Sequence, residues 1–279
     1  MEASSSAPLR VIEPPKGFSL PSVKELWHDR DLFYFLARRE VSVRYKQSVI
    51  GVFWAVLQPL LLAVVFSVFF GHLAKVPSEP GVPYAVFAVS GMVLWLFFAG
   101  AMSASSESTV ANEKLISKVY FPRVIIPLTA VCPPLVDFCV AFVVVVIAIF
   151  VYGIVPPIQI FLMPLLVLLA LTTAIGIGLW LSALNVRYRD VHHAIPFLIL
   201  IGLFISPITY PFHLVPHDLR AIYAINPLVG VLELYRWMLF PSAGWPGAII
   251  IIPIVASIVL LVSGAAYFQR AESSFADII

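Results

Sequence analysis

The chain has 279 residues, of which 61% are hydrophobic and 11% are charged, and its mean hydropathy is +1.00. Soluble domains carry about 25% charged residues, so this composition excludes an ordinary soluble globular protein and indicates an integral membrane protein. The formal net charge is only +2, so the positions of the charges carry more information than their sum.

The N-terminal residues 1–25 predict an extended arm. They include PLRVIEPPKGFSLP, and the four prolines of this stretch disfavour a helix. Residues 1–31 contain no apolar core followed by a cleavage site, so no signal peptide is expected.

Residues 26–48 form a basic segment before the first apolar run. Leu32, Leu36 and Val43 share one face of a helical wheel, although Arg39 interrupts that face. The segment therefore predicts a helix that lies in the membrane interface, and an irregular solvated arm is the alternative. The cations next to the apolar run are Arg38, Arg39, Arg44 and Lys46.

Six apolar runs predict an all-α membrane protein with six transmembrane helices, since a crossing needs about 20 apolar residues. The third run contains Pro127, Pro133 and Pro134, which predict a kink or an interfacial start. The fifth is short and is expected to end inside the membrane at Ser206-Pro207. The runs cover residues 49–71, 84–103, 124–152, 160–184, 194–210 and 247–268, in a transmembrane domain of residues 49–270 followed by a tail of residues 271–279.

Lysine and arginine are distributed unevenly between the connecting segments. Fourteen lie in residues 1–48, 104–123, 185–193 and 269–279, whereas three lie in residues 72–83, 153–159 and 211–246. Cytoplasmic loops are enriched in positive charge, so this bias places both termini in the cytoplasm, as an even number of spans requires. Each cation before the first span contributes about 1 kcal/mol at an anionic cytoplasmic surface.

Residues 211–246 contain a helix that is too short to be a seventh span. Asn226 and Pro227 are a favourable N-cap and first helical residue, and Pro241 follows the helix. A helix of 14 residues extends about 21 Å, whereas the hydrocarbon core is about 30 Å thick. We expect a re-entrant helix, which is either a gate beside an aqueous cavity or a structural plug with a Glu233–Arg236 ion pair.

Sequence motifs for nucleotides and metals are missing. The chain has no G-x-x-x-x-G-K-[ST], no H-E-x-x-H and no Cys/His cluster, so we expect it to bind neither ATP nor a metal by these motifs. Pro216 separates His213 from His217 and disfavours a helical metal site there. Cys132 and Cys139 are too far apart along a predicted helix, at about 10 Å, to form a disulfide.

Asp137 is the one acidic residue deep in a predicted span. A carboxylate at the centre of a bilayer costs at least about 2.5–3.5 kcal/mol, so such a residue is a functional candidate by default. It either couples transport to protons or is a protonated or hydrogen-bonded group that tethers neighbouring helices. No obvious internal repeat accompanies it, which disfavours a secondary transporter.

The loop between the second and third spans reads ANEKLISKVYFPRVIIPL (111–128). By itself it is a basic loop whose apolar residues have helical spacing. It also resembles the N-x-x-L-I-x-K-x-Y-F-P-R loop of ABC-2 permeases that export polysaccharides. Five further stretches resemble the same family in order: RRE-x-x-x-RYKQS-x-x-G-x-x-WA-x-x-QP (38–59), PLVDF (134–138), N-x-RYRD (185–190), SPITYP (206–211) and NP-x-x-x-x-x-E-x-x-R (226–236).

This resemblance covers residues 25 to 270 and is closest to O-antigen permeases of Gram-negative bacteria. It implies a homodimer with two copies of a separate nucleotide-binding subunit, which binds ATP and Mg²⁺. Residues 26–46 would be an interface helix near this ATPase. A coupling helix would contact the ATPase through Lys114, Leu115, Ile116, Lys118, Val119, Tyr120, Phe121, Pro122 and Arg123, with apolar knobs transmitting its closure.

The same resemblance implies that residues 209–240 form periplasmic gate helices and that spans 1 and 5 line the pore. The gate candidates are Pro207, Tyr210, Asn226, Pro227, Glu233 and Arg236. The pore candidates are Trp54, Phe66 and Phe69, because sugar C–H faces pack on aromatic rings. Aromatic residues are also common in membrane helices and interfaces, so this assignment has a structural alternative.

The implied function is that of a transporter subunit and not an enzyme. It would move lipid-linked polysaccharide, O-antigen above all, across the bacterial inner membrane. Capsule or teichoic acid chains are alternative substrates, and a proton-coupled carrier that uses Asp137 is a further alternative. Short, acid-poor loops disfavour a membrane-embedded glycosyltransferase.

Overall fold

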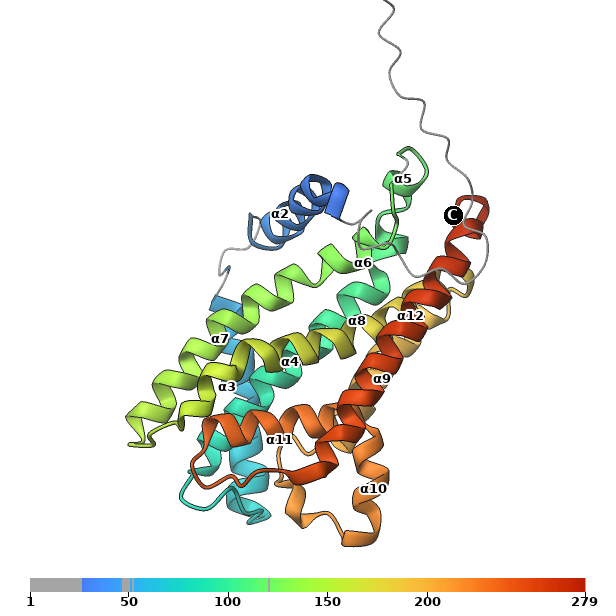
Figure 1. Ribbon diagram of the computed structural model, residues 1–279. Coiled ribbons are helices and arrows are strands. Elements are labelled where there is room, and N and C mark those ends of the chain that lie inside the picture. The colour runs from blue at the N-terminus through green and yellow to red at the C-terminus, as the bar shows by residue number, and fades with distance from the viewer. Residues whose placement is uncertain (1–26, 47–50, 52, 120, 279) are drawn as a thin grey trace, which may run out of the picture.

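The computed structural model describes residues 27–46, 51, 53–119 and 121–278, and these residues form helices and connecting segments without a strand (Figure 1). The predicted arm of residues 1–25 and Tyr120 lie outside the described residues. The helices are α2 (Arg30–Lys46), α3 (Phe53–Phe66), α4 (Tyr84–Ala111), α5 (Glu113–Ile116), α6 (Ile125–Ala130), α7 (Cys132–Val151), α8 (Met163–Arg187), α9 (Val191–Ile205), α10 (His217–Ile225), α11 (Pro227–Leu239) and α12 (Ile251–Ile278).

Five helical segments of the described residues are long and apolar enough to cross a membrane, and each coincides with a predicted span. They are Phe53–Leu73, Tyr84–Ala111, Ile125–Val151, Ile158–Arg187 and Ile251–Glu272. The remaining predicted span, residues 194–210, forms the shorter helix α9 of 15 residues, which extends about 22 Å. Length alone therefore supports five crossings and does not confirm the predicted six.

The third span is interrupted close to its prolines. α6 ends at Ala130, and α7 begins at Cys132 with Pro133 and Pro134 in its first turn. Proline suits the first turn of a helix, where its missing N–H group has no partner to lose, but it disrupts a helix interior. The helix of the third span is therefore broken at Val131, next to the prolines that predicted a kink or an interfacial start.

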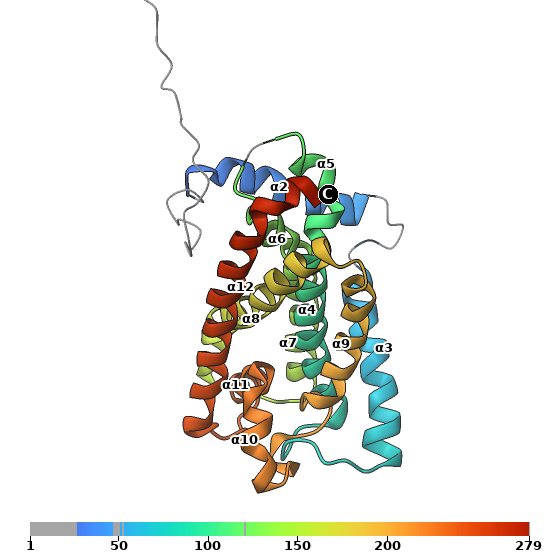
Figure 2. The ribbon, with the colours of Figure 1, turned by 90° about the vertical axis from the view of Figure 1, so that its right-hand side faces the viewer.

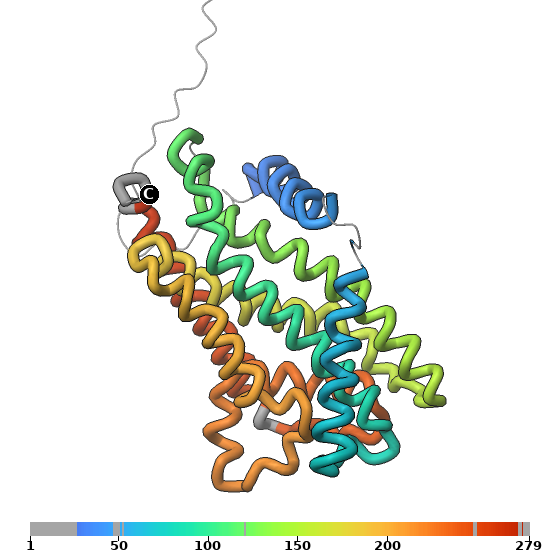
Figure 3. Tube along the Cα trace, turned by 180° about the vertical axis from the view of Figure 1, so that it is seen from behind, coloured from blue at the N-terminus to red at the C-terminus, as the bar shows by residue number. Residues whose placement is uncertain are grey.

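α4 is the central helix, and α3, α7, α8 and α9 pack around it (Figure 3). Most of its side chains are buried, whereas half of the 14 side chains of α3 are exposed. Several serine and threonine residues near the end of α4 satisfy their hydroxyls within the protein, whereas the buried Ser105 hydroxyl has no hydrogen-bond partner among the described residues. For example, Ser106 donates to the carbonyl of Met102 (2.6 Å), and Thr109 and Ser182 of α8 share a hydrogen bond of 2.6 Å.

α8 and α12 cross closely because glycines face each other. A Cβ atom on Gly264 of α12 would lie 2.4 Å from the carbonyl oxygen of Gly176 in α8. Small residues let membrane helices approach in this way, and polar side chains then bond across the contact. Here Thr173 and Ser257 share a hydrogen bond of 2.7 Å.

The two ends of the molecule carry different elements. α2, α5 and the end of α12 lie at one end, and α10 and α11 lie at the other (Figure 2). α12 continues as a helix to Ile278, so most of the predicted tail extends the last span. Candidate site residues are present at both ends.

Candidate functional site

α2 lies across α6 and α7 at the first of these ends. Residues 30–46 are helical, so the irregular alternative does not apply to them. Leu36 is buried, whereas all four cations named for this segment are exposed. Two of these cations, Arg39 and Arg44, also bond to the bundle.

Two side chains near the end of α2 bond to the carboxylate of Asp137 in α7. Arg44 Nη2 lies 2.5 Å from Asp137 Oδ2, and the Tyr45 hydroxyl donates a hydrogen bond of 2.5 Å to Asp137 Oδ1. Burial and this hydrogen bond raise the pKa of Tyr45, so its hydroxyl stays protonated and remains a donor. Both carboxylate oxygens of Asp137 have partners, which is the arrangement expected of a helix tether.

Arg39 connects α2 to the end of α4. Its Nη2 atom lies 2.5 Å from Asn112 Oδ1 and 2.6 Å from Glu40 Oε1. Asn112 in turn donates from Nδ2 to the carbonyl of Ser108 (2.9 Å). Arg39 and Arg44 therefore hold α2 at two points on the bundle, on α4 and on α7.

The loop after α4 contains a single helical turn, so the helix expected around Lys114–Arg123 is wrong in its length. α5 ends at Ile116, and the chain turns at Ser117 and Lys118. Helical geometry is disfavoured for the residue before a proline, so the Phe121-Pro122 pair would stop a longer helix before Arg123, although α5 already ends at Ile116.

Most of the apolar residues of this loop pack against the rest of the protein and are not exposed at its surface. Ile116 is 4% exposed and Phe121 is 7% exposed, and they form a cluster with Ile126 of α6. Leu32 of α2 and Leu115 pack against this cluster. Of the described residues named for coupling, the exposed ones are Lys114, Lys118 and Val119.

Arg123 ties the same loop to α12. Its backbone N–H donates to Glu272 Oε1 (3.1 Å), and its Nη1 atom donates to the carbonyl of Glu272. Pro122 beside it is half-buried. The loop is thus attached to α2 through the apolar cluster and to α12 through Arg123.

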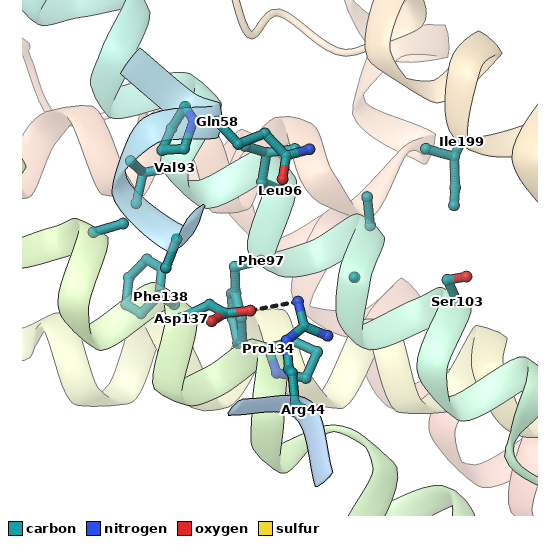
Figure 4. Close-up of a pocket in the computed structure, with 15 residues that line it drawn as sticks. Arg44, Gln58, Val93, Leu96, Phe97, Ser103, Pro134, Asp137, Phe138 and Ile199 are labelled. Carbon is teal, nitrogen blue, oxygen red and sulfur yellow. Dashed lines mark ion pairs between the residues drawn. The ribbon is translucent and has the colours of Figure 1, made fainter. Parts of the chain in front are cut away.

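A cavity of about 320 Å³ lies beside the Arg44–Asp137 pair. Figure 4 shows the two side chains facing each other, with Phe97 beside them and Gln58 and Ser103 at other parts of the wall. Most of the lining is apolar, as is usual for small-molecule sites with a few convergent polar groups. The lining comes from α2, α3, α4, α7 and α9: Arg44, Ala55, Gln58, Pro59, Val93, Leu96, Phe97, Ala99, Gly100, Ser103, Pro134, Asp137, Phe138, Ala141 and Ile199.

At the opposite end, α11 matches its prediction closely. It has 13 residues and begins at Pro227, and the Asn226 side chain accepts a hydrogen bond of 3.1 Å from the N–H of Leu228. The predicted ion pair is confirmed, with Arg236 Nη1 3.2 Å from Glu233 Oε1.

The remaining gate candidates lie in the segment after α9, next to α11. The carbonyl of Pro207 accepts a hydrogen bond of 2.5 Å from Arg236 Nη2. Tyr210 donates to the carbonyl of Phe204 (3.3 Å). The structure therefore brings Pro207 and Arg236, far apart in sequence, into direct contact.

The three aromatic candidates are not part of the cavity wall. Trp54 and Phe69 are exposed, and Phe66 is half-buried with its ring centroid 5.4 Å from that of Phe70. They lie on α3 and its continuation to Leu73, which is the least buried of the five long segments.

Sequence reasoning assigned no role to Tyr45, Gln58 or Ser103. Two of them carried a usable signal, since Gln58 is strongly polar within an apolar run and Tyr45 lies in the RYKQS stretch. Nothing in the local pattern distinguishes Ser103 from the other serines of α4.

Comparisons with known proteins agree over most of the chain. A family model described as ABC-2 type transporter matches residues 31–240. An O-antigen export system permease protein RfbA of Klebsiella pneumoniae is 30% identical over 250 residues, which cover 89% of this chain and 95% of that protein. The Myxococcus xanthus protein of the same name is 27% identical over 260 residues, 92% of this chain and 98% of that protein.

A relative with a different substrate name is also similar. The polysialic acid transport protein KpsM of Escherichia coli is 24% identical over 241 residues, which cover 85% of this chain and 92% of that protein. All three relatives align along nearly their whole length, and the family model spans both ends of the bundle, from α2 to α11. The chain therefore belongs to the ABC-2 type transporter family.

Proposed function

We propose that this chain is the membrane-spanning subunit of an ATP-driven exporter, which moves lipid-linked polysaccharide across the bacterial inner membrane. Two copies form the conduit, and two copies of a separate subunit bind ATP and Mg²⁺ and hydrolyse ATP. The observation that carries this proposal is the alignment with the K. pneumoniae O-antigen permease, at 30% identity over 95% of that protein.

O-antigen is the substrate class that the relatives favour. The proteins named for O-antigen export are 27–30% identical to this chain, whereas the polysialic acid transport proteins are 23–24% identical. A capsule-type chain is the second candidate, because that relative aligns over 92% of its own length.

We propose six crossings with both termini in the cytoplasm. α9 runs from the end that carries α5 toward the end that carries α10 (Figure 2). A helix of about 22 Å can complete a crossing if buried backbone continues it, because non-helical backbone at membrane depth is tolerated only inside protein or beside water. α10 and α11 then return to the outer side as re-entrant gate helices.

The ATPase partner is proposed to dock at the end formed by α2 and α5. Among the described coupling candidates, Lys114, Lys118 and Val119 are exposed there, and the buried cluster behind them connects the docking surface to α2. The contact of Arg123 with Glu272 extends this connection to α12. A movement of the ATPase would therefore shift α2 and α12 together.

Proton coupling through Asp137 is not proposed. Both of its carboxylate oxygens are engaged by α2 side chains, which supports a tether. The conduit is proposed to run along α3, its continuation to Leu73, and α9, whose large exposed apolar residues include Trp54, Phe69 and Phe204.

The proposal is tested by deleting the gene for this chain in its own host. Polysaccharide should disappear from the cell surface, and its lipid-linked form should accumulate inside. A plasmid copy should restore export, but not when the partner cannot hydrolyse ATP. If the purified chain alone moved lipid-linked glycan across vesicles, the proposal would be overturned.

A further inference from the structure

Residues 206–209 follow the end of α9 and form a turn. The turn is buried although its backbone is not helical. Ser206 has extended backbone angles (φ −87°, ψ 143°) and is fully buried, as is Ile208. Thr209 is 7% exposed. Backbone carbonyls in such a place lack helical partners, so other groups of the protein must bind them.

The Arg236 guanidinium binds two of these carbonyls. Its Nη2 atom donates to the carbonyls of Pro207 (2.5 Å) and Ile208 (3.1 Å), while Nη1 donates to Glu233 Oε1 (3.2 Å). The carbon at the centre of the guanidinium lies 4.2 Å from the centroid of the Phe87 ring of α4. One side chain on α11 thus joins the turn, α11 and α4.

This arginine is almost completely buried, with 2% of its side chain exposed. Burial of a charge is expensive unless the charge is paired and hydrogen-bonded. Both terminal nitrogens of Arg236 meet this condition, through one carboxylate and two carbonyls, and an aromatic face lies against the group, whereas its buried Nε atom has no hydrogen-bond partner among the described residues. A planar guanidinium can make these contacts at once, whereas the single ammonium group of lysine cannot reproduce their geometry.

Other hydrogen bonds attach the turn to α4 and to the N-cap residue of α11. Tyr84 of α4 donates to the carbonyl of Thr209 (2.7 Å), and Asn226 Nδ2 donates to Ser206 Oγ (3.0 Å). Gly91 of α4 permits a very close approach, since a Cβ atom there would lie 2.5 Å from the carbonyl oxygen of Ile208.

The two helices beside the turn differ in burial. Ten of the 13 residues of α11 are buried, and a Cβ atom on Gly230 would lie 2.5 Å from Pro253 of α12. In α10 the buried residue is Ala224, and Leu219, Ile222 and Ile225 are exposed. α11 is therefore held by its neighbours on several sides, and α10 is held much less.

We infer that Arg236 is a positioning residue that holds the turn of residues 206–209 shut against α4, so that the turn and α11 act as one fixed body. Opening at this end then takes place at α10 and its flanking loop. This inference rests on the proposed export function for its consequence, but the closure of the turn can be measured without export.

The test uses thiol accessibility in the full-length chain. Cys132 and Cys139 are replaced by alanine, and Thr209→Cys serves as the reporter. Membranes of the producing cell are opened so that a membrane-impermeant maleimide reaches both faces, and the rate of labelling is measured. Arg236→Lys is compared with Arg220→Lys, a control in which the arginine also donates to carbonyls (Val215 and His213) but lies half-buried on α10, outside the turn.

With Arg236 present, labelling of the reporter should be slow, and Arg236→Lys should accelerate it at least about tenfold, because charge-assisted hydrogen bonds to the turn are lost. Arg220→Lys should leave the rate unchanged. Fast labelling with Arg236 present, or equal rates in Arg236→Lys, would overturn the inference. The failure of lysine to restore closure separates a requirement for guanidinium geometry from a requirement for charge alone.

Tyr84→Phe provides a milder variant in case Arg236→Lys does not accumulate in the membrane. It removes one hydrogen bond to the turn and should raise the labelling rate about two- to tenfold. An unchanged rate in Tyr84→Phe would then overturn the inference. Labelling could follow these expectations while the chain without substitutions fails to export polysaccharide. In that case the proposed function would be wrong, and the inference that the turn is held closed would still be supported.

Discussion

At the scale of single residues, the most informative side chain is Asp137. An acid in an apolar helix needs partners, and these come from α2, outside the span. Arg44 is 49% exposed and Asp137 is 20% exposed, so solvent screens their attraction in part. We therefore expect the pair to stabilise the contact between α2 and α7 by about 1 kcal/mol or less.

Asp137→Asn should loosen α2 without unfolding the bundle. The amide oxygen can still accept from Tyr45, but the charge attraction to Arg44 is lost. We expect the melting temperature of the purified protein to fall by roughly 2–4 °C or less and export to fall only in part. The melting temperature and export are also measured in the control variant Asp31→Asn. In the parent chain Asp31 Oδ1 lies 3.8 Å from Arg30 Nε, and the Asp31 side chain is 97% exposed.

The control should change neither quantity. Complete loss of export in Asp137→Asn with an unchanged melting temperature would contradict the tether, because a tether acts through stability and position. That result would favour proton coupling by Asp137.

At the scale of elements, the loop after α4 shows what local sequence can predict. Its basic character and its position between two spans follow from composition, and α5 does form at Glu113–Ile116. Which apolar residues turn inward depends on α2, because Leu32 packs against the cluster that contains Ile116 and Phe121. A helical wheel of the loop alone does not include that neighbour.

The exposed valine of this loop gives a sharper test of coupling than the half-buried Leu115. Val119→Asp changes a side chain that is 52% exposed, so the fold should tolerate it, while an apolar contact with the ATPase would be lost. We expect export and stimulation of the ATPase to fall at least about tenfold at unchanged membrane levels, because burying an unpaired carboxylate in a contact is costly. ATP hydrolysis and surface polysaccharide are the measurements.

Val155→Asp is the matched control, since it introduces the same charge at a valine that is 73% exposed in the connection between α7 and α8. It should leave ATPase stimulation unchanged. If both variants lost stimulation equally, or neither did, α5 and its loop would not be the coupling surface.

The elements were more predictable than their contacts for a physical reason. Hydropathy is a local property, so five of the long apolar helices, and the cap of α11 at Asn226, follow from neighbouring residues. The bond between Arg44 and Asp137 depends on α2 folding back over α7, which no spacing in the sequence predicts. The sequence predicts the end of the helix at Ser206-Pro207, and α9 does end at Ile205, but no spacing predicts that Arg236 contacts this turn.

At the scale of the whole molecule, the charge distribution and the arrangement of the helix ends both fit the proposed six crossings. α2, α5 and the end of α12 lie at the same end of the bundle (Figure 2). If the spans begin and finish at one face of the membrane, their number must be even, as the proposal requires. Fourteen of the 17 lysine and arginine residues belong to the segments assigned to the cytoplasm from sequence.

This agreement predicts the location of the C-terminus, which distinguishes six crossings from five. A fluorescent protein that matures only in the cytoplasm should be fluorescent when fused after Ile279, and alkaline phosphatase, which is active only outside, should be inactive there. Phosphatase inserted at residues 153–157 should be active, because this connection carries no lysine or arginine and leads from α7 toward α8. A C-terminal phosphatase with full activity would mean that α9 does not cross, and its 15 residues would then have to lie with α10 and α11 on one side of the membrane.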